Sequence, residues 1–393
     1  MRLCLIEYGD VRDALTRMKA GAAETYRAQY YSLLYILGLR ARSESISYIN
    51  IGNDEPFDEL IEGIRAIGFN LYAPGGEERM IQMLEDIKPT HIVLRSPLEF
   101  VLRWARENDC RVLPMLADSF SRPPISLKGF KQWRWTRGFV KSLNDPSVTL
   151  VANHNVAACR DLAQIGVAPD KIIPWDWPSV KTPADYETKA LGDTPPYNVL
   201  YVGLMTPRKG VDDLIDAFAQ NEWLSANVTL TLVGGGYKTF ADQVEALGLE
   251  KVVTFTGTIA NSEVMERMQK ASIVAVPSRH DYPEGLPGTI YEALTVRTPL
   301  LLSDHPMFRP FFKDGDGVRV APAKNPAALG DVLVSMLSDP GAYAALSQKT
   351  ADAFEAISCP HAWADVIEHW LNDDAEGYLA QHRGAWAVTP APA

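Results

Sequence analysis

Hydrophobic residues occur along the chain in short continuous runs, and each run is followed by a stretch with the periodicity of an amphipathic helix. In the first half, runs of strand length lie at residues 2–8, 45–51, 90–95, 111–116 and 148–152. Helical spacing is found between them at residues 22–38, 76–87, 98–108 and 126–143. The alternation restarts with runs at residues 198–203, 228–234, 252–257, 272–277 and 298–303. The chain therefore shows one strand-then-helix arrangement twice.

Runs that are apolar throughout indicate parallel strands covered by helices on both faces of a sheet. Two such series predict an α/β fold of two doubly wound, Rossmann-like parallel-sheet domains that face each other across a cleft. A closed eight-fold barrel is the alternative, but residues 178–197 contain four prolines and little apolar periodicity, as expected of a linker. The predicted segments are a first domain, a linker, a second domain and C-terminal helices with a loose tail, at 1–180, 181–196, 197–360 and 361–393.

Charge and cysteine content narrow the functional classes. The 393 residues include 38 Lys and Arg against 49 Asp and Glu, which gives a formal net charge of −11. Such an acidic chain argues against a nucleic-acid binder that neutralises phosphates over its whole surface. The four cysteines show no CxxC or Cys/His spacing, which predicts neither a disulfide framework nor a zinc site. With no recognisable signal peptide or long apolar segment, we expect a soluble, cytoplasmic protein.

The segment PSRHDYPEGLPGTIYEAL, residues 277–294, carries the strongest chemical signal. A strand ends at Pro277, and a helix is expected to begin near Leu286–Gly288, where unpaired amides and the helix dipole can hold a phosphate. Glu284 and Glu292 lie about 12 Å apart if the span between them is helical, which exceeds the ~5–9.5 Å of a glycosidase carboxylate pair. They would instead hold two ends of an extended ligand such as a nucleotide-sugar. The alternative is that Glu284 caps the helix and Glu292 is solvated.

A second loop carries two adjacent cations. In YVGLMTPRKGVDDLIDAF, residues 201–218, Arg208 and Lys209 precede a predicted helix. Cations in this position can neutralise the charge that develops on a departing diphosphate. The alternative is that they are solvated and compensate Asp212 and Asp213 in the first turn of the helix.

A third loop, LVGGGYK at residues 232–238, follows a predicted strand and contains three consecutive glycines. It fails the dinucleotide-binding fingerprint, because Thr239 stands where the third glycine of that motif belongs. The loop therefore gives only a weak signal for a redox cofactor. It is more consistent with a backbone that a ligand approaches closely, at Gly235.

These residues resemble the GT-B retaining glycosyltransferases of the glycogen-synthase-like family 4, also called glycosyl transferases group 1. The resemblance is strong over residues 197–340 and loose before them. In the strong region, E-G-L-P-G-T-I-Y-E, V-G-x-x-x-P-x-K-G, L-V-G-x-G and T-P-L-L-L-S-D-H follow the family's order. The resemblance implies that Glu284 holds donor-sugar hydroxyls, Glu292 the ribose and Lys209 the diphosphate. It also implies that the C-terminal helices cross back to the first domain.

The family's pattern places further contacts to the donor on loop residues. The amides of residues 285–289 would lie along the sugar and phosphates, and the loop at residues 258–259 would flank the base. The expected donor-binding loop residues are Gly203, Gly235, Thr258, Ile259, Gly285, Leu286, Pro287, Gly288 and Thr289. One departure concerns the diphosphate: the family usually carries an arginine directly after the glycine at position 203, whereas this chain has Leu204. Arg208 is the candidate to replace it.

The first half offers weaker candidates. KAGAAETYR, residues 19–27, resembles a weakened form of the small-residue loop with which the family approaches the donor phosphates, and Gly21 is its candidate contact. An ordinary helix start is the alternative. Asp118 follows a predicted strand where the family carries a His or Asp facing the reacting sugar. His154 ends another predicted strand, as a substrate contact or as a structural hydrogen-bonding residue.

The segment 126–143 contrasts with the acidic background. It contains no acidic residue, and its cations and aromatic residues are Lys128, Lys131, Arg134, Arg137, Lys141, Phe130, Trp133, Trp135 and Phe139. A basic aromatic helix on an acidic protein indicates docking to an anionic membrane surface. The alternative is a helix that packs on the sheet and has a solvated basic side. Because Trp133 and Trp135 cannot share one helical face, we expect at least one of them to pack inward.

The sequence thus predicts a retaining glycosyltransferase that moves a sugar from a nucleotide-diphosphate sugar to an acceptor hydroxyl, in cell-surface polysaccharide or lipid-linked glycan assembly. The expected catalytic residues are Asp118, Arg208, Lys209 and Glu284. We expect no metal and no cofactor besides the donor, a sugar or lipid-linked acceptor, peripheral association with the inner face of the membrane, and no nucleic acid. The alternatives are a nucleotide-sugar epimerase or phosphorylase on the same fold, and a catalytically silent scaffold, which Leu204 suggests.

Overall fold

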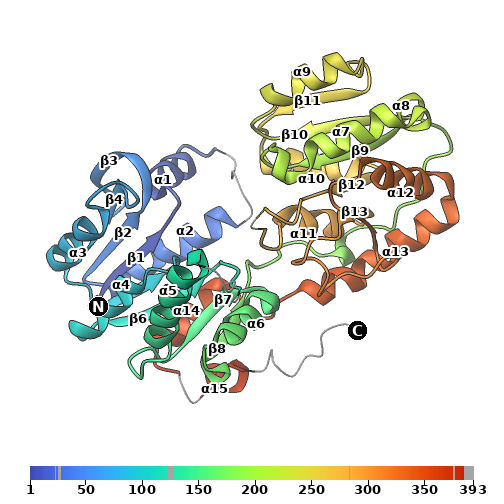
Figure 1. The fold of residues 1–393 in the computed structure, drawn as a ribbon. Coiled ribbons are helices and arrows are strands. Elements are labelled where there is room, and N and C mark those ends of the chain that lie inside the picture. The colour runs from blue at the N-terminus through green and yellow to red at the C-terminus, as the bar shows by residue number, and fades with distance from the viewer. Residues whose placement is uncertain (23, 25–27, 122–126, 283, 375–376, 385–393) are drawn as a thin grey trace. The chain divides into compact units, whose positions relative to one another are not determined.

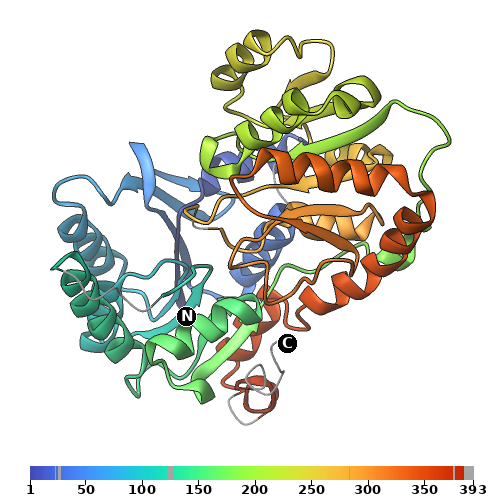
Figure 2. The same ribbon diagram turned by 45° about the vertical axis from the view of Figure 1, so that its right-hand side comes forward.

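The computed structural model describes residues 1–22, 24, 28–121, 127–282, 284–374 and 377–384. The chain divides into two compact units (Figures 1 and 2). Unit 1 comprises Met1–Pro178 and the segment that begins at Cys359, and unit 2 comprises Ser179–Ser358. The predicted loose tail falls largely on residues 385–393, which lie outside the described residues.

Unit 1 is built on an eight-stranded sheet with the strand order β3-β4-β2-β1-β5-β6-β7-β8. All neighbouring strands are parallel except β3 and β4, which pair antiparallel. In chain order the strands are Arg2–Glu7, Ser45–Asn50, Gly52–Ile61, Ile64–Asn70, His91–Leu94, Arg111–Leu116, Val151–His154 and Ile172–Trp175. The sequence pattern did not predict β3, β4 or β8. The first sheet is therefore larger than predicted, and one of its edges is antiparallel.

Helices cover both faces of this sheet. Those of unit 1 are α1 to α6, α14 and α15, at Val11–Lys19, Gln29–Gly38, Gly76–Ile87, Glu99–Glu107, Leu127–Leu143, Asn155–Ile165, Trp363–Leu371 and Tyr378–His382. On one face, Leu84, Trp104 and Phe139 place α3, α4 and α5 in a common core. On the other, Leu15 and Trp363 place α1 and α14 in a second core. Segments from opposite ends of the chain thus pack on the same face of one sheet.

Unit 2 is built on a six-stranded sheet with the order β11-β10-β9-β12-β13-β14, and every neighbouring pair is parallel. The strands β9 to β14 are Tyr197–Val202, Val228–Val233, Val253–Gly257, Ile273–Val276, Leu300–Ser303 and Val318–Ala321. The helices α7 to α13 are Val211–Gln220, Glu222–Asn227, Lys238–Ala246, Asn261–Lys270, Gly288–Thr295, Pro326–Ser338 and Pro340–Ile357. The predicted class of two doubly wound α/β domains is confirmed.

The core of unit 2 shows why its sheet needs helices on both sides. Val199 and Tyr201 of β9 belong to a cluster that includes buried residues of α7, α9 and α12. The intervening Leu200 is equally buried and points to the opposite face, since side chains alternate along a strand. There β9 contacts α10, and β12 and β13 contact α11. This is the burial that a continuous apolar run predicts.

Candidate functional site

The loops with the strongest chemical signal gather at one edge of the unit 2 sheet. Because all six strands are parallel, their carboxyl ends lie at the same edge, which is where doubly wound sheets bind ligands. The loops that follow the strands are 203–210, 234–237, 258–260, 277–287, 304–317 and 322–325. The sequence candidates of the second half lie in these loops or, like Thr289 and Glu292, in the helix α11 that follows one of them.

Glycines let these loops pack backbone against backbone. A Cβ atom on Gly234 would lie 1.9 Å from the carbonyl oxygen of Gly203, and one on Gly210 would lie 2.1 Å from that of Pro277. Both glycines also have positive φ angles, of 134° and 71°. Gly235 differs, because its φ is not in this range and the nearest atoms to a Cβ there are 3.9 Å away. Space for a ligand beside the backbone therefore exists at Gly235, and not at Gly234.

Lys209 and Glu284 form a buried ion pair at this edge. The Lys209 Nζ atom donates to both carboxylate oxygens of Glu284, at 2.6 and 2.8 Å, and the Ser278 hydroxyl donates to Oε1 at 2.9 Å. The side chains of Lys209 and Glu284 are only 16% and 7% exposed. The Tyr282 ring lies 4.3 Å from the ammonium group, which adds a cation–π contact. The loops after β9 and β12 are thus joined by a charged pair with little access to water.

The alternative role of Glu284, as a helix cap, is wrong. The N-cap position of α11 is Pro287, and no side chain caps this helix start. Gly285 and Gly288 are exposed on either side of Leu286, which is buried and fixes the loop to the core. Among the described residues, the first amides of α11 therefore have no side-chain partner, as the anion-binding interpretation requires.

Glu292 lies in α11, one turn after Thr289. Its Oε1 atom accepts a hydrogen bond from the Asn261 side chain at the start of α10, with a distance of 2.8 Å. The Thr289 hydroxyl donates to the carbonyl of Val202 at 3.2 Å and ties the helix to the end of β9. Glu292 is half-buried. The carboxylate is therefore held in place by a neighbouring helix, unlike a freely solvated side chain.

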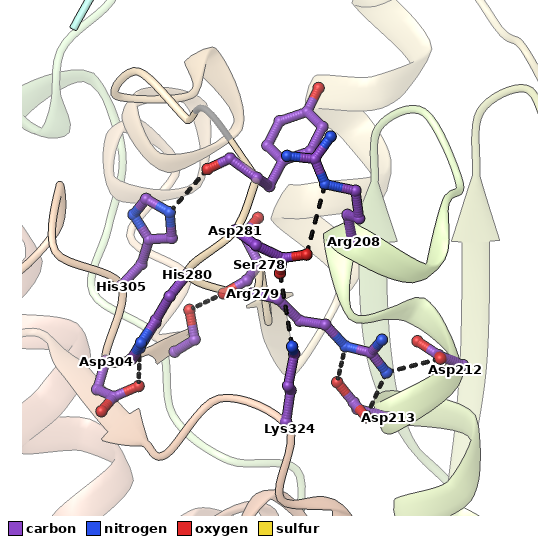
Figure 3. A network of polar contacts seen from close by, with 12 residues as sticks. Arg208, Asp212, Asp213, Ser278, Arg279, His280, Asp281, Asp304, His305 and Lys324 are labelled. Atoms are coloured by element: carbon purple, nitrogen blue, oxygen red, sulfur yellow. Dashed lines mark hydrogen bonds and ion pairs between the residues drawn. The ribbon is translucent and has the colours of Figure 1, made fainter. Parts of the chain in front are cut away.

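A second set of charges lies on the more exposed side of the same loops (Figure 3). Asp281 lies between two cations, 3.6 Å from Arg208 Nε and 3.7 Å from Lys324 Nζ. All three side chains are more than half exposed. Pairs this long and this exposed are weak, so Arg208 and Lys324 can exchange Asp281 for an anionic ligand at little cost.

The alternative reading of Arg208 and Lys209, as compensation for the acidic first turn of α7, is also wrong. Arg279 takes that role: its guanidinium donates to Asp213 at 2.7 and 2.8 Å and to Asp212 at 2.6 Å (Figure 3). Its hydrogen bond with Asp213 raises the pKa of Arg279. These hydrogen bonds tie the loop after β12 to α7. Arg208 and Lys209 pair with other groups, namely Asp281 and Glu284.

Two histidines tie the loop after β12 to the segment that follows β13: His280 lies in the loop, and His305 follows the neighbouring strand. His280 Nε2 lies 2.7 Å from Asp304 Oδ1, and Asp304 also accepts from Arg309 at 2.9 Å. His305 is buried and lies 3.1 Å from the carbonyl oxygen of Tyr282, and burial lowers its pKa. These contacts position the backbone that carries Glu284.

Several residues of this network were not predicted as site residues, namely Ser278, Arg279, His280, Asn261, Asp304, His305 and Lys324. A usable signal was present for five of them. Asp304 and His305 directly follow the apolar run at 298–303, and Ser278, Arg279 and His280 follow the run at 272–277. The rule that ligands bind at the carboxyl ends of parallel strands would have selected these positions. Lys324 and Asn261 carried no comparable signal.

The remaining loop candidates lie at the same edge. Gly203 directly follows β9, and its N–H donates to the carbonyl of Val233 at 2.9 Å. Thr258 and Ile259 follow β11, and Thr258 Oγ1 is the nearest atom to a Cβ on Gly235. Leu204 is 56% exposed, and its carbonyl accepts from the Tyr201 hydroxyl. The departure from the family pattern thus places an apolar side chain on the surface beside the glycine loop.

The candidates of the first half belong to unit 1. Asp118 lies two residues beyond β6 and is half-buried, and burial raises the pKa of its carboxyl. The Asn153 side chain donates to its backbone carbonyl at 3.0 Å. His154 ends β7, with Nε2 3.1 Å from the buried Asp176. Gly21 is exposed with a φ of 68°, while much of the segment around it, residues 23 and 25–27, lies outside the described residues.

The basic aromatic segment forms α5, apart from Ser126, which lies outside the described residues. Its inward side includes Thr136, Phe139, Ser142 and Leu143. Trp133 and Trp135 are both exposed, at 46% and 42%, but the Trp135 ring stacks on the buried Phe139 at 5.1 Å, so the expected inward packing is only partial. The buried positions of a helix recur every three or four residues, and in α5 they include Thr136, Phe139 and Leu143. We call the outward set the α5 face: Phe130, Lys131, Trp133, Arg134, Trp135, Arg137 and Lys141.

Part of the second half of the chain matches a known sequence family. Residues 186–353, less than half of the chain, match the family model Glycosyl transferases group 1. Glycogen synthase of Mycobacterium tuberculosis is 29% identical over 194 residues, which cover 49% of this chain and 44% of that protein. Phosphatidyl-myo-inositol mannosyltransferase of Mycobacterium leprae is 31% identical over 140 residues, 35% of this chain and 37% of that one. The match thus spans less than half the length of either relative.

Solved structures resemble the chain over nearly its whole length. HepE of Anabaena, crystallised with UDP and glucose, has a TM-score of 0.64 at 17% identity and covers 96% of this chain and 99% of its own. Sucrose-phosphate synthase of Thermosynechococcus elongatus has a TM-score of 0.64 at 18% identity, with coverages of 95% and 98%. At these identities the likeness shows the fold. The chain has the GT-B fold.

Proposed function

We propose that the protein is a glycosyltransferase that moves a sugar from a nucleotide-diphosphate sugar to an acceptor hydroxyl, with retention of anomeric configuration. The observation that carries the proposal is the buried Lys209–Glu284 pair at the edge of the unit 2 sheet, next to a start of α11 that no described side chain caps. The family match over residues 186–353 includes this region. HepE was crystallised with UDP-glucose, which supports a donor of the same chemical class here.

In the proposed complex, unit 2 binds the donor. Glu292, held by Asn261, accepts hydrogen bonds from the ribose hydroxyls, and Glu284 accepts them from the sugar. Lys209 then shares its charge between Glu284 and the diphosphate, since an ammonium group has three donors. The backbone N–H groups of Gly285, Leu286, Gly288 and Thr289 add uncharged donors to the phosphates.

The chemical step breaks the bond between the anomeric carbon and the diphosphate oxygen, and forms a bond from that carbon to the acceptor oxygen on the same face. The acceptor hydroxyl loses its proton to the departing phosphate oxygen, so no side-chain nucleophile is consumed. Lys209 and Arg208 stabilise the negative charge that develops on the diphosphate. We propose that Asp118 of unit 1 contacts the reacting sugars, and that His154, fixed by Asp176, contributes to that surface.

The missing arginine at position 204 is compensated in this proposal by Arg208. Its partner Asp281 is more than half exposed and 3.6 Å away, so the guanidinium is available to a diphosphate. Arginine suits this role because its planar group binds phosphate oxygens in pairs. A silent scaffold would have no use for a cation kept beside the buried pair.

Thermal unfolding in the presence of nucleotides tests the donor site without an acceptor. Among UDP, GDP, ADP, TDP and their sugar conjugates, we expect one base to raise the melting temperature selectively, because a ligand at a hundred times its dissociation constant adds about 2.7 kcal/mol of stability. Glu292→Ala should weaken this shift, since the ribose loses its acceptor. Glu250→Ala is the control, because Glu250 is an exposed carboxylate at the turn before β11. A chain that no nucleotide stabilises would be a scaffold.

We further propose that the α5 face binds an anionic membrane surface, which fits a lipid-linked acceptor. On a chain with net charge −11, this face presents Lys131, Arg134, Arg137 and Lys141 together with three exposed aromatic rings. Arg137 lies over the Trp133 ring at 5.3 Å. Cations of this kind contribute about 1 kcal/mol each near anionic lipid, and tryptophan favours the interface. No described helix is both long and apolar enough to cross a bilayer.

Co-sedimentation with vesicles of phosphatidylglycerol and phosphatidylcholine tests the α5 face. The protein should bind at low salt and be released at high salt, and Lys131→Glu with Arg134→Glu should weaken binding at least about 30-fold, from about 2 kcal/mol of lost attraction. Lys251→Glu, an exposed charge reversal in unit 2, should leave binding unchanged. Equal binding to pure phosphatidylcholine would show that the face does not recognise anionic lipid, and no binding to either vesicle would show that it is only solvated.

A further inference from the structure

The carboxyl edge of the unit 1 sheet carries its own cluster of side chains. Apart from the antiparallel β3, the strands of this sheet all end at the same edge (Figure 1). Tyr8 directly follows β1, Tyr72 lies two residues beyond β4, and Asp118 lies two residues beyond β6. Only β2 separates β4 from β1 in the sheet, and the two tyrosines reach across it.

Tyr8 and Tyr72 form an exposed aromatic pair. Their hydroxyl oxygens are 3.2 Å apart, and the residues are 49% and 66% exposed. The backbone beneath Tyr72 is fixed, because its N–H donates to the Asn70 side chain at 2.9 Å and Leu71 donates to the carbonyl of Ile51. Two large aromatic rings therefore lie at the surface and are not packed in the hydrophobic core. Exposed aromatic rings in a fixed position are typical of a binding surface.

The charge of the surroundings limits what these rings can bind. Glu7 and Arg95 form an ion pair at 3.1 Å that is mostly buried, and the Tyr48 hydroxyl donates to Glu7 as well. The charges of Glu7 and Arg95 cancel each other. The carboxylate of Asp118 is then the remaining charge among these groups, and it is negative. Burial and the hydrogen bond to Tyr8 raise the pKa of Tyr72, and the charge of Asp118 raises it further. The edge offers neutral hydroxyls, ring faces and a carboxylate, and no unpaired cation among these groups.

We infer that Tyr8, Tyr72 and Asp118 form an acceptor subsite that selects a neutral pyranose ring. One face of a pyranose carries axial C–H groups, which pack on an aromatic ring, while its hydroxyls donate to a carboxylate and exchange hydrogen bonds with tyrosine hydroxyls. A phosphorylated or otherwise anionic sugar would be repelled by Asp118. The inference rests on the proposed function, because it names the acceptor class of that reaction.

Saturation-transfer difference NMR on the full chain tests the subsite without a donor. The probes are the methyl α-pyranosides of glucose, galactose and mannose, compared with glucose 6-phosphate. At least one neutral pyranoside should bind in the millimolar range, and Tyr72→Ala and Tyr8→Ala should each weaken it about tenfold, the value of one lost ring contact. Tyr72→Phe, which keeps the ring, should retain most of the affinity. Tyr186→Ala, a half-exposed tyrosine of unit 2, should change nothing.

The outcomes separate this inference from the proposed function. Tyr72→Ala should leave the nucleotide-induced rise in melting temperature intact, while Glu292→Ala should leave pyranoside binding intact. A nucleotide shift without pyranoside binding, tighter binding of glucose 6-phosphate, or equal affinity of Tyr72→Ala and wild type would each overturn the subsite and spare the donor site. Loss of the nucleotide response alone would overturn the proposed function.

Discussion

Replacing Glu284 with alanine should lower the rate of sugar transfer by about 10²–10³-fold, the usual effect of removing one hydrogen-bonding group that acts in the transition state. The carboxylate is 7% exposed and accepts from Lys209 twice and from Ser278 once, so its position is fixed before any ligand binds. Initial rates with the donor identified by thermal unfolding, and with a panel of neutral glycosides as acceptors, measure the effect.

The same substitution should also reduce stability, by about 3–5 kcal/mol, because it leaves a mostly buried ammonium group without its partner. Two variants separate folding from chemistry. Glu284→Gln keeps the shape and can still accept from Ser278 and Lys209, so it should be more stable than the alanine variant. Lys209→Met combined with Glu284→Gln removes both charges and should recover most of the stability, while transfer stays low.

Two results would contradict the role given to Glu284. If the double variant recovered activity along with stability, the pair would serve folding alone. If Glu284→Ala were folded and fully active, the sugar would be held elsewhere. An epimerase or phosphorylase would also lose activity on this substitution, so the products must be identified before the rate is assigned to transfer.

Much of the fold could be predicted because most strands are apolar throughout and most helices between them are amphipathic. The run at 2–8 became β1, Arg2–Glu7, in the middle of its sheet, where both faces are covered. The strand β3 was missed because it lies at the edge of the sheet and is largely exposed, so its ten residues carry no apolar pattern. The strands β8 and β14 were also missed: each lies at an edge of its sheet and has only four residues, one of which is Pro174 in β8 and Arg319 in β14.

Residues of the candidate site could be predicted only where they lie close together in the sequence. The motif at residues 277–294 showed Glu284, Glu292 and the helix start, because all three lie within one strand-loop-helix unit. The pairing of Glu284 with Lys209 joins positions 75 residues apart, and nothing in either segment indicates it. Arg279 likewise reaches α7 across 66 residues. Partners between loops depend on strand order, which the sequence pattern leaves open.

The loop after β10 offers a matched pair of substitutions, and Gly234→Ala should be the more damaging by far. A Cβ there would lie 1.9 Å from the Gly203 carbonyl oxygen, and the φ of 134° is strained for alanine. Both contacting groups are backbone, so neither can move without shifting the end of β9. We expect a loss of at least about 4 kcal/mol, which belongs to the most severe class of single substitutions.

Gly235→Ala should leave stability nearly unchanged, because the nearest atoms to its Cβ are 3.9 and 4.0 Å away and its φ is ordinary. If the donor approaches the backbone here, the added methyl group should weaken the nucleotide-induced rise in melting temperature. Urea denaturation of both variants, followed by nucleotide titration of Gly235→Ala, checks the pair. Equal stabilities for the two variants would mean that the loops do not pack backbone against backbone. An unchanged nucleotide response would show that Gly235 is not part of the donor site. A large loss of stability in Gly234→Ala would still show that the loop structure requires glycine at position 234.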